Sequence, residues 1–257
     1  MADLVVSDVT KAFGEKTVLQ DVSIRIQDHE LVSLLGVSGG GKTTLFNVIS
    51  GLLTPDRGQV LLDGDDITGI PGKVSYMLQK DLLLPYRTVE DNVALPLVIG
   101  GMKKKEARQK VAPYFEEFGL LGTEKKYPAQ LSGGMRHRAA LLRTYLFSDR
   151  LALLDEPFSA LDTLTKRAMH RWYLDVMEQI HLSTIFITHD IDEAVLLSDR
   201  IYILGGKPGR IVDEIRIEEP RPRQNDFQLT DRFLFYKKRI LQTMRPFQVL
   251  CKRKKLI

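Results

Sequence analysis

Cysteine and long apolar segments are both scarce in this sequence. The 257 residues include one cysteine, Cys251, so no disulfide can form within the chain, and no Cys/His cluster has metal-site spacing. The apolar runs, such as Leu31–Leu35, are far shorter than the roughly 20 residues of a spanning helix. The first residues, which include acids, predict no signal peptide. We therefore expect any work at a membrane to require a partner.

The charge is only mildly unbalanced. A net charge of +4 accompanies 27% charged and 44% hydrophobic residues, which is enough apolar material for a sizeable core. Much of the excess lies in the last stretch, KRKKLI. A solvated end is the ordinary interpretation of such a tail, and contact with anionic lipid or nucleic acid is the alternative.

Short apolar runs alternate with helical patterns, which indicates an α/β fold. The predicted strands cover 31–35, 74–78, 151–154, 184–188, 200–204 and 211–217, and a helix is predicted over 42–50. Between about 85 and 150 only helices are expected, over 89–98, 104–118 and 134–147, which suggests a helical insertion. The residues from Phe227 onward predict a basic amphipathic helix or a loose tail.

A glycine-rich segment follows the first buried strand and fits the phosphate-loop pattern G-x-x-x-x-G-K-[ST]. Its backbone N–H groups would converge on phosphate oxygens, and the helix after it would direct its positive end at the same anion. A glycine-rich turn is the alternative, and the loop alone leaves kinases, GTPases and recombinases open. The predicted nucleotide ligands are Gly36, Ser38, Gly39, Gly40, Gly41, Lys42, Thr43 and Thr44.

Two carboxylates, Asp155 and Glu156, end the apolar run at 151–154. Ligands of doubly wound sheets bind at this end of the strands. We expect Asp155 to hold Mg²⁺ together with the Thr43 hydroxyl, and Glu156 to act as the general base for the attacking water. A solvated acidic turn is the alternative interpretation.

Ser132, Gly133 and Gly134 precede a helical pattern and form a second possible anion-binding helix start. Taken alone, this segment predicts only an N-capped helix with a flexible lead-in. Taken with the other motifs, it resembles the signature of ATP-binding subunits of ABC transporters, LSGGQ or a close variant. The resemblance spans roughly residues 3–218 and includes, in the family's order, Phe13, the phosphate loop, Gln79, 131–135, 155–156, 159–162 and His189.

The resemblance implies roles for isolated residues. Phe13 would stack on adenine, and Gln79 would contact Mg²⁺ and the attacking water and sense a membrane partner. His189 would contact the γ-phosphate, and Asp162 would organise a subunit contact. Without the resemblance, Phe13, Gln79 and His189 would be a core aromatic, a solvated loop residue and a helix-cap histidine.

The resemblance also implies an architecture: a P-loop NTPase core of the ABC type with an inserted helical subdomain and an antiparallel β portion. Residues 1–218 would form the ATP-binding domain, with the insertion at about 85–150, and 219–257 a basic extension. The family's dimer is head-to-tail, so Ser132, Gly133 and Gly134 would act on the partner's ATP. Val37, the extra Gly40, Met135 and His137 depart from the common pattern but remove no phosphate-contacting group.

Three segments, at 79–88, 131–136 and 207–211, resemble importers of the nitrate/sulfonate/taurine type, which include carriers of pyrimidine precursors. We therefore expect permease subunits as partners and, indirectly, an extracytoplasmic solute-binding protein. This chain would lie peripherally on the cytoplasmic face of the membrane, with no nucleic acid bound.

A short permease helix would be received by the apolar residues Leu82, Leu83, Leu84 and Tyr86. A minor core is the alternative interpretation of these residues. The competing functions are a soluble ABC ATPase not coupled to transport and a module that does not hydrolyse ATP.

Overall fold

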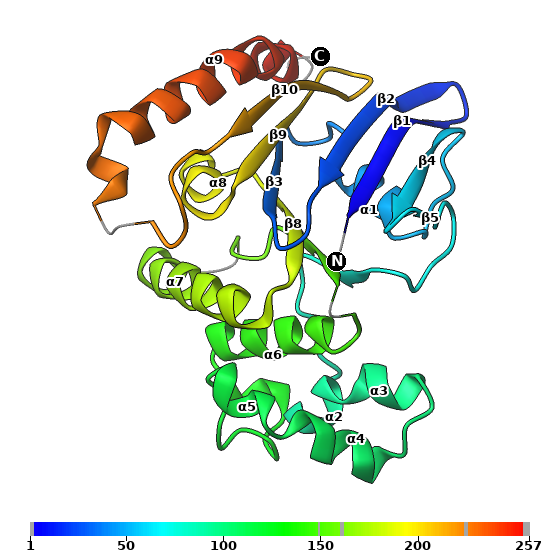
Figure 1. Ribbon diagram of the computed structural model, residues 1–257, viewed down its shortest axis with the longest axis vertical. Coiled ribbons are helices and arrows are strands. Elements are labelled where there is room, and N and C mark those ends of the chain that lie inside the picture. Colours follow the sequence, from blue (N-terminus) through cyan, green and yellow to red (C-terminus); the bar gives the residue numbers. More distant parts are fainter. Residues whose placement is uncertain (1–2, 149, 160–161, 224–225, 254–257) are drawn as a thin grey trace. The chain divides into compact units, whose positions relative to one another are not determined.

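The computed structural model describes residues 3–148, 150–159, 162–223 and 226–253. Ala160 and Leu161 of the 159–162 motif and the basic residues after Arg253 lie outside these ranges. The chain divides into two compact units: Met1–Lys73 with Ser183–Ile257, and Val74–Leu182 (Figure 1). We call them unit 1 and unit 2.

Unit 1 contains an antiparallel sheet with the strand order β2-β1-β4-β5. Along β2, buried and exposed side chains alternate toward its end, as expected for a strand with one face on a core. This sheet is the antiparallel portion that the family resemblance implied. Its strands are β1 (Leu4–Phe13), β2 (Lys16–Ile26), β4 (Arg57–Leu62) and β5 (Asp65–Asp66).

A second set of strands in unit 1 runs in the order β10-β9-β3-β8. The strands β3, β8 and β9 are parallel and entirely buried, which explains their unbroken apolar runs, whereas β10 is antiparallel. Two helices follow strands of this set. The elements are β3 (Leu31–Gly36), α1 (Lys42–Ile49), β8 (Ser183–Thr188), α8 (Ile191–Leu197), β9 (Arg200–Gly205) and β10 (Arg210–Arg216).

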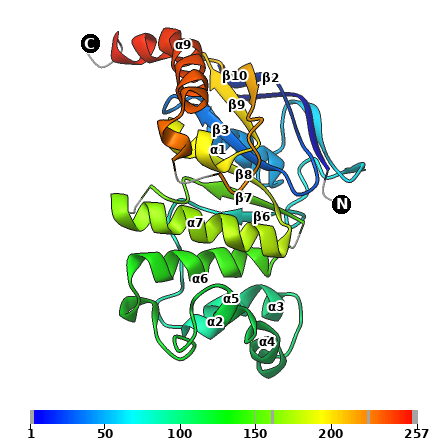
Figure 2. The ribbon, with the colours of Figure 1, turned by 60° about the vertical axis from the view of Figure 1, so that its left-hand side comes forward.

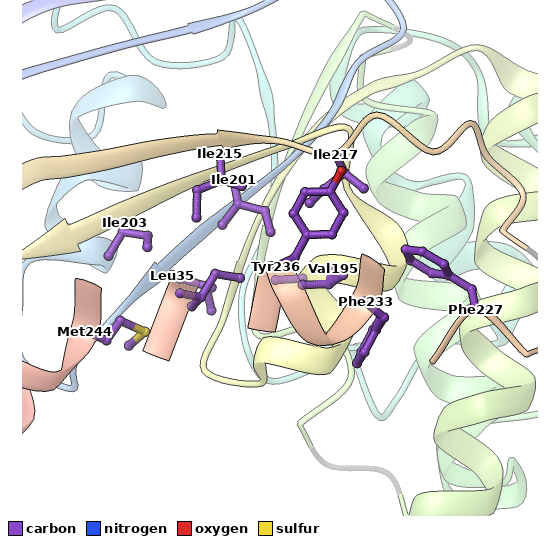
Figure 3. Close-up of a cluster of buried hydrophobic side chains, with 12 residues drawn as sticks. Leu35, Val195, Ile201, Ile203, Ile215, Ile217, Phe227, Phe233, Tyr236 and Met244 are labelled. Atoms are coloured by element: carbon purple, nitrogen blue, oxygen red, sulfur yellow. The ribbon is translucent and has the colours of Figure 1, made fainter. Parts of the chain in front are cut away.

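The last described residues of unit 1 are helical and pack on its strands and on α8. A 3₁₀ turn, η2 (Phe227–Leu229), leads into α9 (Asp231–Arg253). Figure 3 shows Phe233, Tyr236 and Met244 of α9 gathered with apolar residues of α8, β9 and β10. Of the two alternatives for this region, the amphipathic helix is therefore correct.

Unit 2 contains two short parallel strands, β6 (Ser75–Met77) and β7 (Leu151–Asp155), and a group of helices (Figure 2). The helices predicted over 89–98 and 104–118 are each broken in two. Pro96 and Pro113 stand at the breaks, and proline donates no N–H to the preceding turn. The helices are α2 (Val89–Val93), α3 (Leu95–Ile99), α4 (Lys104–Val111), α5 (Tyr114–Glu117), η1 (Pro128–Gln130), α6 (Gly133–Tyr145) and α7 (Thr163–Ile180).

Among the described residues, no helix is both long enough and apolar enough to cross a membrane.

Candidate active site

The phosphate loop lies between β3 and α1, as predicted. Gly39 and Gly41 have φ values of 71° and 101°, which residues with a Cβ rarely adopt. Gly41 also stands at the N-cap of α1, where no side chain caps the first turn. The backbone therefore curls as an anion cradle requires, and the helix N-terminus adds partial positive charge.

Lys42 is held over this loop. Its ammonium group donates to the carbonyl oxygens of Gly36 at 2.8 Å and Val37 at 3.2 Å, and the residue is buried. Thr43, on the first turn of α1, is exposed, and Thr44 is half-buried. The loop thus presents a cation and a hydroxyl at the end of β3.

A second glycine segment packs against the back of the phosphate loop. An ideal Cβ on Gly209 would lie 2.3 Å from the Gly40 carbonyl oxygen, so no larger residue fits without displacing the loop. The Gly209 N–H donates to the Val18 carbonyl at 2.8 Å, and the Gly209 carbonyl accepts from the Gln20 N–H at 3.0 Å. In the sequence, the K-P-G-R turn was only a mark of the importer subgroup, and nothing in it indicated this support of the loop.

Two further predicted residues belong to unit 1. Phe13 ends β1 and is 52% exposed, so about half of its surface is accessible to a partner. His189 directly follows β8 and is exposed. Since Leu35 and Thr188 are opposite each other in parallel strands, Gly36 and His189 leave the sheet at the same edge.

Unit 2 brings Gln79 and Glu156 together. The Gln79 amide donates to the Glu156 carboxylate at 3.0 Å, across the ends of the neighbouring strands β6 and β7. Glu156 has a φ of 49°, and its carbonyl accepts hydrogen bonds from both the backbone N–H and the hydroxyl of Ser159. The turn after β7 therefore fixes the direction of the Glu156 side chain.

Asp155 is buried at the end of β7, beside Tyr76 on β6. Burial, with the Asp155 carboxylate close by, raises the pKa of the Tyr76 phenol well above its usual value. Tyr76 therefore stays protonated and neutral next to the carboxylate. The described residues contain no group of three His, Cys, Asp or Glu side chains that could by itself hold a metal ion. A magnesium site here would need hydroxyl, amide and phosphate oxygens as additional ligands.

The signature segment forms the predicted capped helix start. The Ser132 hydroxyl accepts from the Met135 N–H at 3.3 Å, and Gly133 and Gly134 make the first turn of α6. Asp162 is likewise a helix cap: its carboxylate accepts from the Thr165 N–H at 3.1 Å, at the start of α7. Its role in a subunit contact stays a prediction.

Helix α6 is tied to the loop after Gln79. The Arg143 guanidinium donates to the carbonyl oxygens of Asp81 at 2.6 Å and Leu82 at 2.8 Å, and Arg136 pairs with the Asp81 carboxylate at 3.3 Å. Leu82 has a φ of 45°, a strained conformation for a leucine, directly where Arg143 binds. We call the two hydrogen bonds from Arg143 the Arg143 clamp; no local sequence pattern pointed to it.

The loop held by the Arg143 clamp carries the predicted apolar patch. Leu82, Leu84 and Tyr86 are exposed, Tyr86 to 92%, and Leu78 adds to them, whereas Leu83 is buried. Three of the four residues predicted to form the patch are thus exposed, and the fourth, Leu83, belongs to the core of unit 2. An exposed patch of this kind is typical of a protein interface.

The predicted residues therefore fall into two groups, each coherent within its own unit. Unit 1 contains Phe13, the phosphate loop and His189, and unit 2 contains Gln79, Asp155, Glu156 and the signature. The first group has the chemistry to bind a nucleoside triphosphate. The second has a carboxylate aligned by an amide, as water activation requires.

Comparisons with known proteins agree with this chemistry. The sequence profile of the ABC transporter family matches residues 19–159. The formylaminopyrimidine import ATP-binding protein of Halalkalibacterium halodurans is 44% identical over 83% of this chain and 84% of its own length. An aliphatic sulfonates import ATP-binding protein of Bacillus cereus is 37% identical over 92% and 94%. The nitrate import ATP-binding protein of Synechocystis is 34% identical over 91% of each chain.

Solved structures show the same fold. A bacterial ABC transporter cassette solved as a dimer matches with a TM-score of 0.71 and 28% identity, covering 84% of this chain and all of that one. The same cassette in a dimeric post-hydrolysis state, bound to ADP and phosphate, matches with a TM-score of 0.70. With the phosphate loop, the aligned carboxylate and the capped signature in place, this chain belongs to the ABC transporter family as one of its ATP-binding, ATP-hydrolysing subunits.

Proposed function

We propose that this ATPase energises the import of a small solute of the nitrate/sulfonate/taurine or pyrimidine-precursor type across the cytoplasmic membrane. The proposal is supported by relatives whose names specify import of formylaminopyrimidine, sulfonates and nitrate, at 34–44% identity along most of their length. The ATPase itself does not contact the cargo, so the solute class follows from relatedness alone.

The observation that supports hydrolysis best is the hydrogen bond between Gln79 and Glu156. In the proposed site the Glu156 carboxylate takes a proton from the water that attacks the γ-phosphorus, and ADP is the leaving group. Gln79 orients that water, and His189 contacts the γ-phosphate. A general base of this kind contributes roughly 10²–10⁴-fold to the rate.

The phosphates are proposed to lie in the loop from Gly36 to Thr44, with adenine stacked on Phe13. Thr43, Gln79 and Asp155 would hold Mg²⁺. Their hydroxyl, amide and carboxylate oxygens are the donors that this ion accepts, and the buried Asp155 carboxylate is the one anionic donor among them. When bound, the ion would neutralise charge on the β- and γ-phosphates.

We propose a head-to-tail dimer in which Ser132, Gly133 and Gly134 of one copy act on the other copy's nucleotide, with Asp162 at the subunit contact. Permease subunits would bind at Leu78, Leu82, Leu84 and Tyr86 on the cytoplasmic face of the membrane, and a solute-binding protein would deliver cargo from the other side. Residues 1–218 are the proposed ATP-binding domain and 219–257 its extension.

A soluble ABC ATPase without a transport partner is the second candidate, and the exposed apolar patch favours the permease interpretation over it. The test is a pull-down of tagged Glu156→Gln with ATP from detergent-solubilised membranes, because this variant should accumulate as the ATP-bound dimer. Recovery of a multi-span membrane protein is expected, with a solute-binding protein alongside it. Recovery of soluble partners alone would refute the transport proposal and leave the ATPase chemistry intact.

A further inference from the structure

The C-terminal extension forms part of the core of unit 1. Its apolar side chains contact α8 and the strands β3, β9 and β10, and each is at most 7% exposed (Figure 3). The extension thus covers the face of α8 that carries Ala194 and Val195. The contributing side chains are Phe227, Phe233, Tyr236, Ile240 and Met244.

Polar contacts from the extension hold α8 at both of its ends. Lys237 pairs with Asp192, in the first turn of α8, at 2.6 Å. Arg223 donates to the carbonyl oxygens of Leu196 at 2.7 Å and Ser198 at 2.8 Å, at the other end of the helix. The last carbonyls of a helix have no N–H partner further along it, so a cationic donor satisfies them well.

Helix α8 in turn holds the residues on both sides of His189. The Asp190 carboxylate caps α8 by accepting from the N–H groups of Asp192 at 3.0 Å and Glu193 at 3.2 Å. The Glu193 carboxylate, which is buried, is hydrogen-bonded to the Thr188 hydroxyl, and that hydroxyl accepts from the Asp190 N–H at 3.0 Å. His189 lies between two residues that are both fixed by α8.

We propose that the C-terminal extension is a positioning element for His189, acting through α8 and the hydrogen bond between Glu193 and Thr188. The inference rests on the proposed contact of His189 with the γ-phosphate. A shift of α8 would be passed by Glu193 to the turn 188–190 and would turn the imidazole away from its target. Small misplacements of this kind lower rates by up to about 100-fold.

Purified full-length variants test the proposal by their ATPase kinetics, with kcat counted per molecule that binds ATP. Phe233→Ala removes a buried ring that faces α8, and Phe235→Ala, on the same helix but 55% exposed, is its matched control. Thr188→Val removes only the hydroxyl that links Glu193 to the turn, and Thr188→Ser restores it. We expect Phe233→Ala and Thr188→Val to lower kcat about tenfold with the KM for ATP within about twofold, and both controls to stay near wild type.

His189→Gln supplies the background that separates positioning from general structural damage. We expect neither Phe233→Ala nor Thr188→Val to lower the residual rate of His189→Gln further, because the group they position is gone. A wild-type kcat in Thr188→Val, or an equal loss in both backgrounds, would overturn the inference while His189 keeps its role. If His189→Gln itself keeps the wild-type kcat, the γ-phosphate role of His189 fails, and the inference with it.

Discussion

Glu156 takes a left-handed backbone conformation at the end of β7, where a residue with a side chain costs about 1 kcal/mol or more. Ser159 maintains this conformation with two hydrogen bonds to the Glu156 carbonyl. The same conformation directs the carboxylate to Gln79. The residue that we assign as the general base is therefore one of the strained positions of the backbone, as Leu82 is in the loop after Gln79.

Gly209 offers a residue-scale test of the phosphate loop. We expect Gly209→Ala to raise the KM for ATP several-fold and to lower stability by about 1–3 kcal/mol, because its Cβ would displace the Gly40 carbonyl. ATP titration and urea unfolding measure the two effects. Gly100→Ala is the control, since its Cβ would meet nothing closer than 3.4 Å. Unchanged ATP affinity in Gly209→Ala would show that the loop does not need this support.

His137 should make stability depend on pH. His137 lies on α6 with its ring beside Phe158, and the burial of the imidazole there lowers the pKa of His137 to about 4. The unfolded chain binds the proton below about pH 6.5 and the native state only near pH 4, so stability is full above pH 6.5 and falls through this window. We expect a loss of about 2 kcal/mol between pH 7 and pH 5 by urea unfolding. His137→Gln, which has no titrating group at this position, should reduce that loss; an identical pH profile would refute the assignment.

At the scale of elements, α6 joins the signature to the loop after Gln79. Its N-terminus is capped by Ser132, and Arg143, in its last turn, donates to the carbonyls of Asp81 and Leu82. A movement of the signature would therefore be transmitted along one rigid helix to the apolar patch. In the proposed assembly, this helix would be a physical route between the partner's nucleotide at the signature and a permease subunit at the apolar patch.

Hydrogen exchange can test this connection. We expect Arg143→Met to speed exchange of the amide protons of residues 82–84 by roughly tenfold or more, because two charge-assisted hydrogen bonds of about 1.5–3 kcal/mol each are lost. Arg167→Met, at an exposed position on α7, should leave these amides unchanged. Equal exchange in the Arg143 variant and the wild type would mean that the loop holds its shape without the clamp.

At the scale of the whole molecule, the proposed head-to-tail dimer predicts complementation. Lys42→Ala removes the phosphate cation, whereas Ser132→Asp keeps the helix cap but sets a negative charge against the partner's phosphate. Each variant alone should be nearly inactive. Mixed dimers should recover part of the wild-type ATPase rate, since one site then combines an intact loop with an intact signature. If mixing restores nothing at any ratio, signature and loop of the same chain serve the same nucleotide.

The phosphate loop, the acidic strand end and the signature were predictable because each depends on a short stretch with fixed spacing. The prolines at the two helix breaks, Pro96 and Pro113, were also visible in the sequence. Unbroken helices were nevertheless predicted, because the apolar periodicity continued across both prolines. The Arg143 clamp, the support of Gly40 by Gly209 and the packing of α9 on α8 arise between distant segments. Such contacts leave no local pattern in one sequence, and the roles of the site residues remain predictions.

The division of unit 1 into two separated segments bears on how the protein is made. Unit 2 is continuous, from Val74 to Leu182, so all of its residues have emerged from the ribosome before the second segment of unit 1 appears. The phosphate loop emerges early, but the two strands that flank β3, β8 and β9, emerge only after unit 2. Helix α9, whose side chains complete the core, follows them. The core that includes Leu35, directly before the phosphate loop, therefore stays incomplete until the side chains of α9 have emerged, although the loop and all of unit 2 are synthesised before them.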